Sequence, residues 1–395
     1  MKKHWLILLC CCGLSAASLG ISVNASGVFY TPVADDLHIL RGTYAMHMTL
    51  FSFAVAIMSL FVPYLYKKYS FKKILNSSII ICVISTALMA VSNNIVMFYI
   101  LGIIRGLSAS LFSSVPITMI INGWFVKKHG FATSIAFSFS GLSGSIFSPI
   151  LSSIINSFNW HIGYLAKALF ILLFCLPAML YPFSISARDE GLLPYGYTKK
   201  QEASKQNNNS FKYLSISFIC FFIFSMLISC ITGITQHLPG YGQSLGYSAT
   251  TCSILLSAGM IGNIISKLII GNLSDLFGEL KASIIMIMIT ICGIILLLLT
   301  NKMTTLIIGA VLFGSCYSLG AVALPLLTRY FFSNDNYAKV FPKISFASNV
   351  GAALSLSLVG YIYDFFNSYS YAFIIALGLI SIDIILLVVI KKTKD

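Results

Sequence analysis

The sequence predicts an all-α membrane protein, with twelve transmembrane helices arranged in two pseudo-symmetric six-helix bundles. Three observations lead to this fold class: the composition, the number of long apolar runs, and a repeat that relates the two halves of the chain. Of the 395 residues, 58% are hydrophobic and only 9% are charged, whereas an average soluble domain is about 25% charged. So few charges could not cover the surface of a water-soluble protein of this length.

The apolar runs have the length that a membrane-spanning helix requires. About 20 consecutive apolar residues cross the hydrocarbon core of a bilayer. The runs that meet this requirement cover residues 5–29, 43–66, 74–92, 95–121, 131–156, 161–183, 213–236, 249–271, 282–300, 304–327, 340–362 and 371–390.

The first run has an alternative interpretation as a secretory signal peptide. Lys2 and Lys3 precede it, and residues 16–18 (Ala-Ala-Ser) are small enough for a cleavage site. However, the run continues to Tyr30, which is too long for the core of a signal peptide. Its removal would also break the symmetry of six plus six spans, so we favour a transmembrane helix.

A repeat relates the two halves. The segment GNLSDLFG at residues 271–278 has a counterpart in register, PYLYKKYS at 63–70, 208 residues earlier. Other pairs keep nearly the same offset: Pro32 and Pro239 are 207 residues apart, and Asn159 and Asn367 are 208 apart. An apolar chain built of two such halves is typical of transporters with a central binding site.

One long polar break separates the halves. It covers residues 184–210 and is rich in Asn, Lys and Ser. We interpret it as a flexible linker between an N-terminal bundle at 1–183 and a C-terminal bundle at 211–395.

The positions of the cations predict the orientation in the membrane. With the N-terminus in the cytoplasm and alternating spans, nineteen of the 25 Lys and Arg residues fall on the cytoplasmic side, and the outer loops hold only Arg41 and Lys302. This asymmetry follows the positive-inside rule. We therefore predict a multi-pass protein of the cytoplasmic (inner) membrane with both termini in the cytoplasm.

The charge distribution, the cysteine spacing and the absence of catalytic motifs exclude several classes of function. Topology explains the net charge of +14, so nucleic-acid binding is not needed to account for it. The ten cysteines lie in apolar runs without metal-like spacing, and no catalytic cluster or phosphate-binding loop is found. We predict no metal, no cofactor and no enzymatic activity.

Charged residues inside the predicted spans are the candidates for a binding site. Such residues are costly, by about 2.5–3.5 kcal/mol on insertion scales, and usually face a cavity. The spans hold four cations, Arg105, Lys167, Lys267 and Lys343, but one acid, Asp383. A bound anion would relieve this imbalance, which makes a small anionic molecule the expected partner besides the lipid bilayer.

Each candidate also has a structural interpretation. Arg105 lies ten residues into its span and could be a buried structural arginine, whereas Lys267 and Lys343 lie near the cytoplasmic ends of theirs and could reach the headgroups. Lys167 lies seven residues after Trp160, roughly 10 Å of helix, and could reach the outer headgroups.

Polar neighbours complete the predicted site. Asn263 lies one turn before Lys267 on the same helix face. Asn24 and Tyr30 are further candidates for the wall of the cavity, although contacts between helices explain such residues as well.

The repeated segment carries a family resemblance. GxLxDxxG after the second and eighth helices resembles the cytoplasmic motif of the major facilitator superfamily, and Gly271, Asp275 and Gly278 fit it. In this family the motif acts as a conformational latch, and the fold is two six-helix bundles. The first copy departs from the motif, with Lys67 in place of the acid, which implies that the N-terminal latch is altered or missing.

A narrower resemblance points to a substrate class. The segments at 24–33, 191–196 and 263–275 are similar to the bacterial oxalate/formate antiporter and monocarboxylate carrier branch. In that branch a cation on the eighth helix and a Lys on the eleventh bind carboxylates. Lys267 stands at the first position, and Lys343 is shifted by about one residue from the second. The family's sixth and twelfth helices lie peripherally, which argues against Lys167 and Asp383 as site residues.

These observations together predict a secondary transporter, monomeric, that moves a mono- or dicarboxylate by alternating access. Exchange of anions is favoured over proton symport, because no Asp or Glu lies in the expected lining. Proton-coupled carboxylate symport and efflux of amphipathic compounds remain alternatives. A transporter-like sensor, from a different functional class, would need an ordered cytoplasmic module, and the linker offers none.

Overall fold

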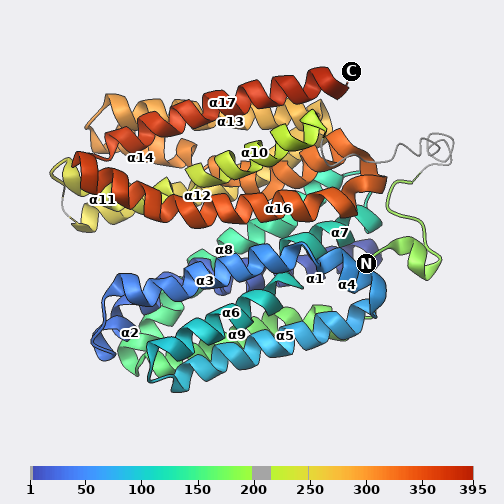
Figure 1. Ribbon diagram of the computed structural model, residues 1–395, viewed down its shortest axis with the longest axis horizontal. Coiled ribbons are helices and arrows are strands. Elements are labelled where there is room, and N and C mark those ends of the chain that lie inside the picture. Colours follow the sequence, from blue (N-terminus) through green and yellow to red (C-terminus); the bar gives the residue numbers. More distant parts are fainter. Residues whose placement is uncertain (1–2, 198–214, 248, 395) are drawn as a thin grey trace. The chain divides into compact units, whose positions relative to one another are not determined.

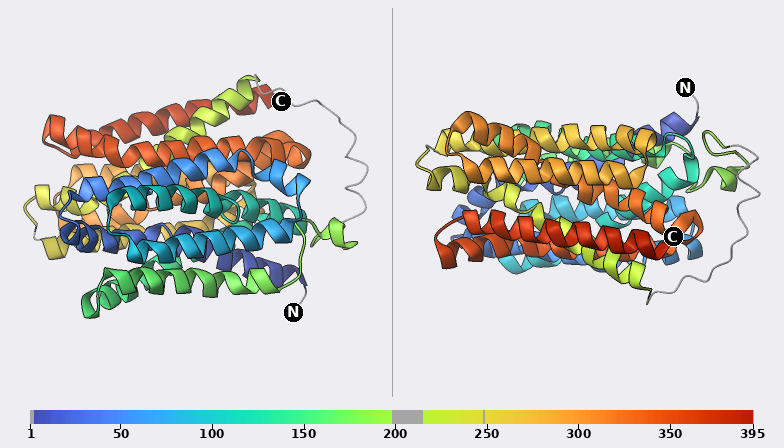
Figure 2. Two further views of the ribbon diagram at one scale, coloured as in Figure 1. Left: turned by 60° about the horizontal axis from the view of Figure 1, so that its bottom comes forward. Right: turned by 90° about the horizontal axis from the view of Figure 1, so that it is seen from above.

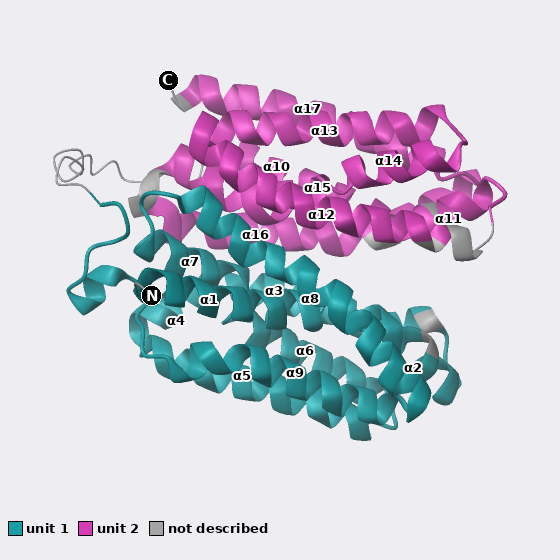
Figure 3. Ribbon diagram, turned by 180° about the vertical axis from the view of Figure 1, so that it is seen from behind, with its two compact units in different colours: residues 1–203 teal, residues 204–395 magenta. Residues whose placement is uncertain are grey.

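The computed structural model describes residues 3–197, 215–247 and 249–394. The chain forms two compact units, residues 1–203 and 204–395 (Figure 3). All regular elements of the described residues are helices, and the β-bridge between Phe125 and Tyr195 is isolated. The predicted all-α class is therefore confirmed.

Unit 1 contains the helices up to residue 190, which run side by side along roughly one direction (Figures 1 and 2). They are α1 (Lys3–Ser15), η1 (Ala16–Ile21), η2 (Asn24–Phe29), α2 (Tyr30–Asp36), α3 (Arg41–Ser59), α4 (Val62–Lys68), α5 (Phe71–Leu88), η3 (Met89–Val91), α6 (Ile95–Ser110), α7 (Ser114–Trp124), α8 (His129–Ser157), α9 (Trp160–Leu180) and η4 (Ala187–Glu190). Among them α3 packs along α6, and α5 packs along both α6 and α9.

Unit 2 contains the remaining helices. They are α10 (Ile216–Ile231), α11 (Ile234–Ser244), α12 (Ala249–Phe277), α13 (Glu279–Leu299), α14 (Met303–Phe313), α15 (Cys316–Ser318), η6 (Leu319–Ala323), α16 (Leu324–Phe366) and α17 (Ser370–Lys394). Here α10 packs against α16 and α17, and α14 packs against α12 and α13.

The number of spans differs in part from the prediction of twelve. Ten described helices, or runs of consecutive helices, are long and apolar enough to cross a membrane, and the bent pair α3–α4 makes eleven. The predicted span at 340–362 lies inside α16, which continues without a break from the preceding span. Lys343, Ser345 and Asn349 lower its hydropathy, so composition alone distinguishes it poorly from a soluble helix.

The first span is not a regular α-helix. After α1 it continues as the π-helical η1 and then, beyond Ser22 and Val23, as the 3₁₀-helical η2. Close packing accompanies this change, since a methyl group added at Gly20 would lie 1.8 Å from Ser143 Oγ of α8. Departures of this kind within a helix often mark functional sites.

The second span is bent by 53° between α3 and α4. Pro63 lies in the first turn of α4. A proline clashes with the carbonyl four residues earlier and removes one amide donor, which explains why the helix is interrupted after Ser59.

The segment predicted as a flexible linker is partly ordered. Tyr195 donates its backbone N–H to Trp124 O at 2.8 Å, and its carbonyl accepts from Val126 N at 3.0 Å. Trp124 Nε1 donates to Ser184 O at 2.9 Å, and Glu190 forms an ion pair with Lys3. The expectation of a flexible tether is therefore wrong for residues 184–197, while the rest of that segment, 198–210, lies outside the described residues.

Candidate functional site

Arg105 is buried in the middle of α6. Its exposed fraction is 0%. Nη2 donates to the carbonyl of Ser22 at 3.2 Å and Nη1 to Met89 Sδ at 3.4 Å, while the guanidinium lies 5.3 Å from the centre of the Phe51 ring. Nε has no hydrogen-bond partner in the part of the chain that the structure describes. A carbonyl oxygen and a thioether sulfur carry no net charge, so they do not neutralise a buried guanidinium. No described carboxylate pairs with Arg105 either, and its charge is therefore uncompensated.

Lys167 lies deeper than the sequence suggested. Its exposed fraction is 1%, and Nζ donates to Ser26 Oγ at 2.7 Å. The ammonium also lies 5.2 Å from the ring centre of Phe29 and 5.8 Å from that of Tyr164. The interpretation of Lys167 as a residue that reaches the outer headgroups is therefore wrong, because the side chain turns towards the broken first span.

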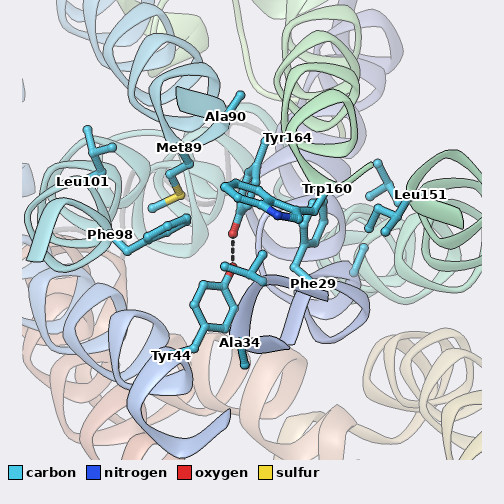
Figure 4. Packing of buried hydrophobic residues seen from close by; sticks show 13 residues of the cluster. Phe29, Ala34, Tyr44, Met89, Ala90, Phe98, Leu101, Leu151, Trp160 and Tyr164 are labelled. Atoms are coloured by element: carbon cyan, nitrogen blue, oxygen red, sulfur yellow. Dashed lines mark hydrogen bonds between the residues drawn. The ribbon is translucent and has the colours of Figure 1, made fainter. Parts of the chain in front are cut away.

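An aromatic cluster surrounds this region of unit 1. The hydroxyls of Tyr44 and Tyr164 are hydrogen-bonded to each other (Figure 4), and the Phe29 and Tyr164 rings lie 4.3 Å apart. Met89 and Phe98 belong to the same buried cluster. The apolar packing fixes the rings against which Lys167 lies.

Asn24 and Tyr30, both predicted for the cavity wall, occupy the edge of this region. Asn24 is exposed, and its Nδ2 donates to Ser140 O at 3.0 Å. The Tyr30 ring packs edge-on against Tyr44 at 5.7 Å and lies 6.5 Å from His47. Each lies in unit 1, Asn24 in η2 and Tyr30 at the start of α2.

Lys267 and Asn263 are both buried on α12 of unit 2, with exposed fractions of 4% and 2%. Asn263 Nδ2 lies 3.9 Å from Met260 Sδ, and its Oδ1 has no hydrogen-bond partner. Lys267 interacts electrostatically with Cys316 of α15. The predicted arrangement of a lysine with an amide one turn away is therefore present in the folded chain.

Glycines bring α12 close to α14 beside these residues. A methyl group added at Gly262 would lie 1.9 Å from Val311 O, and one added at Gly314 would lie 2.2 Å from Gly259 O. Because glycine lets helices approach closely, the backbone around Asn263 is tightly enclosed.

Lys343 is half-buried on α16, and its Nζ donates to Lys339 O at 3.2 Å, one turn earlier in the same helix. This contact agrees with either a cavity or an interfacial position.

The predicted latch residues lie at the junction of α12 and α13. Gly271 is buried, Asp275 is exposed, and Gly278 has a φ of +89°. This positive φ requires glycine at the turn between the helices. Asp275 and Glu279 both attract Arg329 electrostatically, so the second copy of the motif lies beside a cation, as a latch would require.

Asp383, the single acid inside the predicted spans, is also buried. Its exposed fraction on α17 is 0%, and neither carboxylate oxygen has a hydrogen-bond partner in the described part of the chain.

Three residues of unit 1 that lie against the buried cations or the aromatic cluster were not predicted from the sequence. Ser22 and Ser26 contact the two buried cations, and His47 is buried against Tyr44 O at 2.5 Å. The two serines lie one helical turn apart in the first predicted span. A small polar face within this apolar run is the sequence signal that could have identified them.

Comparisons with known proteins agree with the fold. Residues 11–254 and 214–395 match the Major Facilitator Superfamily. The MFS-type transporter pynF of Aspergillus niger is 26% identical over 318 residues, which cover 76% of this chain and 68% of that protein. Monocarboxylate transporter 13 of Rattus norvegicus is 23% identical over 287 residues, 70% of this chain. This chain spans 63% of the length of that relative, less than two thirds.

Solved structures resemble the whole chain. The human organic anion transporter MFSD10 (TETRAN) has a TM-score of 0.72 at 13% identity, covering 98% of this chain and 100% of that one. A variant of the E. coli fucose:proton symporter FucP has a TM-score of 0.69 at 14% identity, covering 98% of both chains. At these identities the similarity shows the fold.

Proposed function

Because the chain belongs to the Major Facilitator Superfamily, we propose that it is a secondary active transporter that moves a small organic anion, a mono- or dicarboxylate, across the membrane. The observation that carries this proposal is the buried, uncompensated charge of Arg105. A cation at that depth is costly, and a carboxylate substrate would offset the cost. The names of two relatives, monocarboxylate transporter 13 and the organic anion transporter MFSD10, support an anionic substrate.

We propose that Arg105 and Lys267 are the cations that take part in substrate binding. Asn263, Asn24 and Tyr30 supply polar contacts, and Lys343 is a further candidate. Alternating access follows when the occupied transporter changes state more readily than the empty one.

Anion exchange is the favoured form of coupling. Among the proposed contact residues none is an Asp or Glu that could carry a proton with the substrate. The alternative, proton symport, rests on Asp383, an acid buried inside a membrane helix without a described partner.

Counterflow in proteoliposomes tests the proposed function. Liposomes containing the purified protein are preloaded with unlabelled carboxylates and offered labelled formate, oxalate, lactate or pyruvate. We expect uptake that depends on the internal carboxylate and persists when the proton gradient is collapsed. No counterflow of any of these anions by folded protein would contradict carboxylate transport.

Two substitutions test the cations. We expect Arg105→Gln and Lys267→Gln each to reduce counterflow at least tenfold, because losing a charged hydrogen bond to the substrate removes about 1.5–3 kcal/mol. Lys302→Gln is the matched control, since Lys302 is exposed just before α14 and should leave the flux unchanged. Unchanged flux in both test variants would remove Arg105 and Lys267 from the site.

A further inference from the structure

Two cations of unit 1 converge on the same short stretch of the first span. Arg105 on α6 donates to the carbonyl of Ser22 at 3.2 Å, and Lys167 on α9 donates to the hydroxyl of Ser26 at 2.7 Å. Ser22 and Ser26 are one helical turn apart, where η1 gives way to η2. The two cations also repel each other electrostatically. The fold therefore holds two like charges close together inside one helical bundle.

This cluster has more hydrogen-bond donors than acceptors. An ammonium carries three N–H donors and a guanidinium five, yet one bond is found for Lys167 and two for Arg105. Arg105 Nε and Ser22 Oγ are buried and have no hydrogen-bond partner among the described residues. Buried polar groups are nearly always paired, so the unused donors point to a missing acceptor.

The described carboxylates of unit 1 do not supply that acceptor. Asp36 accepts from Trp160 Nε1 at 3.0 Å, Glu190 pairs with Lys3, and Asp189 caps the first turn of η4. Asp35 is exposed, near the end of α2. None of them makes an ion pair with Arg105 or Lys167.

The aromatic rings offset only part of the charge. Phe51 lies against Arg105, while Phe29 and Tyr164 lie against Lys167. Even when desolvated, such cation–π contacts recover only part of the free energy that burying an ion costs. A bound negative charge would offset the repulsion between the two cations.

We propose that Arg105 and Lys167 together bind one small monovalent anion inside unit 1, beside Ser22 and Ser26. The shared chemistry is a compact negative charge that accepts several hydrogen bonds. The anion can be the carboxylate of a transported substrate, and in that case the inference rests on the proposed function. It can also be a free inorganic anion such as chloride, and in that case the inference is independent of the proposed function. Lys167 then belongs to an anion site, although its helix was expected to be peripheral.

Thermal unfolding of the full-length protein in detergent tests the site directly. The unfolding midpoint is measured at constant ionic strength in chloride, in formate, and in the bulky anion of morpholinoethanesulfonic acid. A ligand that binds only the folded state raises the midpoint as its concentration increases. We expect chloride, formate or both to raise it above that in the bulky anion. Equal midpoints in all three would overturn the proposal.

Substitutions distinguish an anion site from a structural lysine. Lys167→Met removes an uncompensated charge, so we expect a midpoint in the bulky anion at least as high as that of the wild type, together with loss of the response to small anions. Arg105→Met should also lose the response. Lys72→Met, a control in the same unit, should keep it. A Lys167→Met protein that is less stable in every anion and still responds would show a structural role and overturn the site.

The three salts and the flux assay identify the source of the anion. Equilibrium dialysis of the wild type with labelled chloride or formate measures binding without any variant. If formate alone binds, and counterflow is lost in Lys167→Met, the site takes the substrate. If chloride binds while no carboxylate is transported, the site stands and the proposed function fails. Carboxylate counterflow without binding of either anion would retain the function and reject the site.

Discussion

Individual glycines determine how closely α12 and α14 pack. A methyl group at Gly262 would lie 1.9 Å from the carbonyl oxygen of Val311, far inside the contact distance of two atoms. We predict that Gly262→Ala lowers the free energy of unfolding by about 1–3 kcal/mol, the usual range for overpacking. The midpoint of thermal unfolding in detergent measures this loss.

Gly378 on α17 is the matched control. Nothing lies within 4 Å of a methyl group added there, and alanine is the better helix former by about 1 kcal/mol. Gly378→Ala should therefore keep or raise the midpoint. An equal decrease in both variants would mean that close helix packing is not the cause.

For Asp383 we predict a substitution that keeps or raises stability, in contrast to Gly262→Ala. Its carboxylate is fully buried and neither oxygen has a hydrogen-bond partner among the residues described, so a charge there would be uncompensated. Asparagine has nearly the same shape and no ionisable group. We predict that Asp383→Asn leaves the unfolding midpoint unchanged or raises it, whereas a large decrease would reveal a partner for the carboxylate.

The same variant separates the two forms of coupling. Under anion exchange, Asp383→Asn should retain counterflow and gain no dependence on the proton gradient. If Asp383 carries a coupled proton, uptake driven by a proton gradient, present in the wild type, should be lost in the variant.

At this scale the sequence predicted which residues are charged within the membrane, but not which way they point. Arg105 could be placed at mid-depth by counting residues along its span. Lys167 could not, because its direction depends on Ser26 and Phe29, which are distant in the sequence, as well as on the ring of Tyr164 one turn earlier on α9. The contacts show that Lys167 does not reach the headgroups, whereas the argument from family analogy against a role in the site stays a prediction.

Among the helices, α9 ends on a side-chain cap. Lys72 Nζ donates to Ala178 O at 2.5 Å and to Tyr181 O at 2.6 Å. The last carbonyls of a helix have no partner within it and attract cations. We predict that Lys72→Met destabilises unit 1 by about 1–2 kcal/mol, measured by the unfolding midpoint.

Lys73 serves as the control for this prediction. It is the next residue in α5, it is exposed, and its substitution by Met should change the midpoint little. The backbone amides at the end of α9 should exchange their hydrogens faster in Lys72→Met, but not in the Lys73 variant. Identical behaviour of the two variants would exclude the cap.

Hydropathy predicted most helices of the membrane part, with ends within a few residues. It could not predict the change from η1 to η2, since winding depends on packing such as that of Gly20 against α8. The order of residues 184–197 was also missed, because a polar composition says nothing about hydrogen bonds to the backbone of Trp124.

For the molecule as a whole, the repeat with an offset of 207 or 208 residues and the composition sufficed to predict the family fold, and the comparisons confirm it. The substrate could not be predicted in this way, because it depends on the shape of a cavity that motifs describe only in part.

The orientation in the membrane remains a prediction that a labelling experiment can test. The positive-inside rule places Lys302 outside and Lys73 in the cytoplasm. In intact cells, Lys302→Cys should react with a thiol reagent that cannot cross the membrane, whereas Lys73→Cys should react only after the cells are opened. The opposite pattern would invert the proposed topology.

The contacts of the N-terminus have a consequence for the order of events during biosynthesis. Lys3 pairs with Glu190, and His4 Nε2 lies 3.0 Å from Leu193 O. The beginning of unit 1 therefore binds residues near its end, which the ribosome adds late in the synthesis of that unit. A nascent chain that ends at Leu180 would hold all the membrane helices of unit 1 but would lack both of these contacts. The next thirteen residues, through Leu193, would supply both partners before unit 2 has been translated.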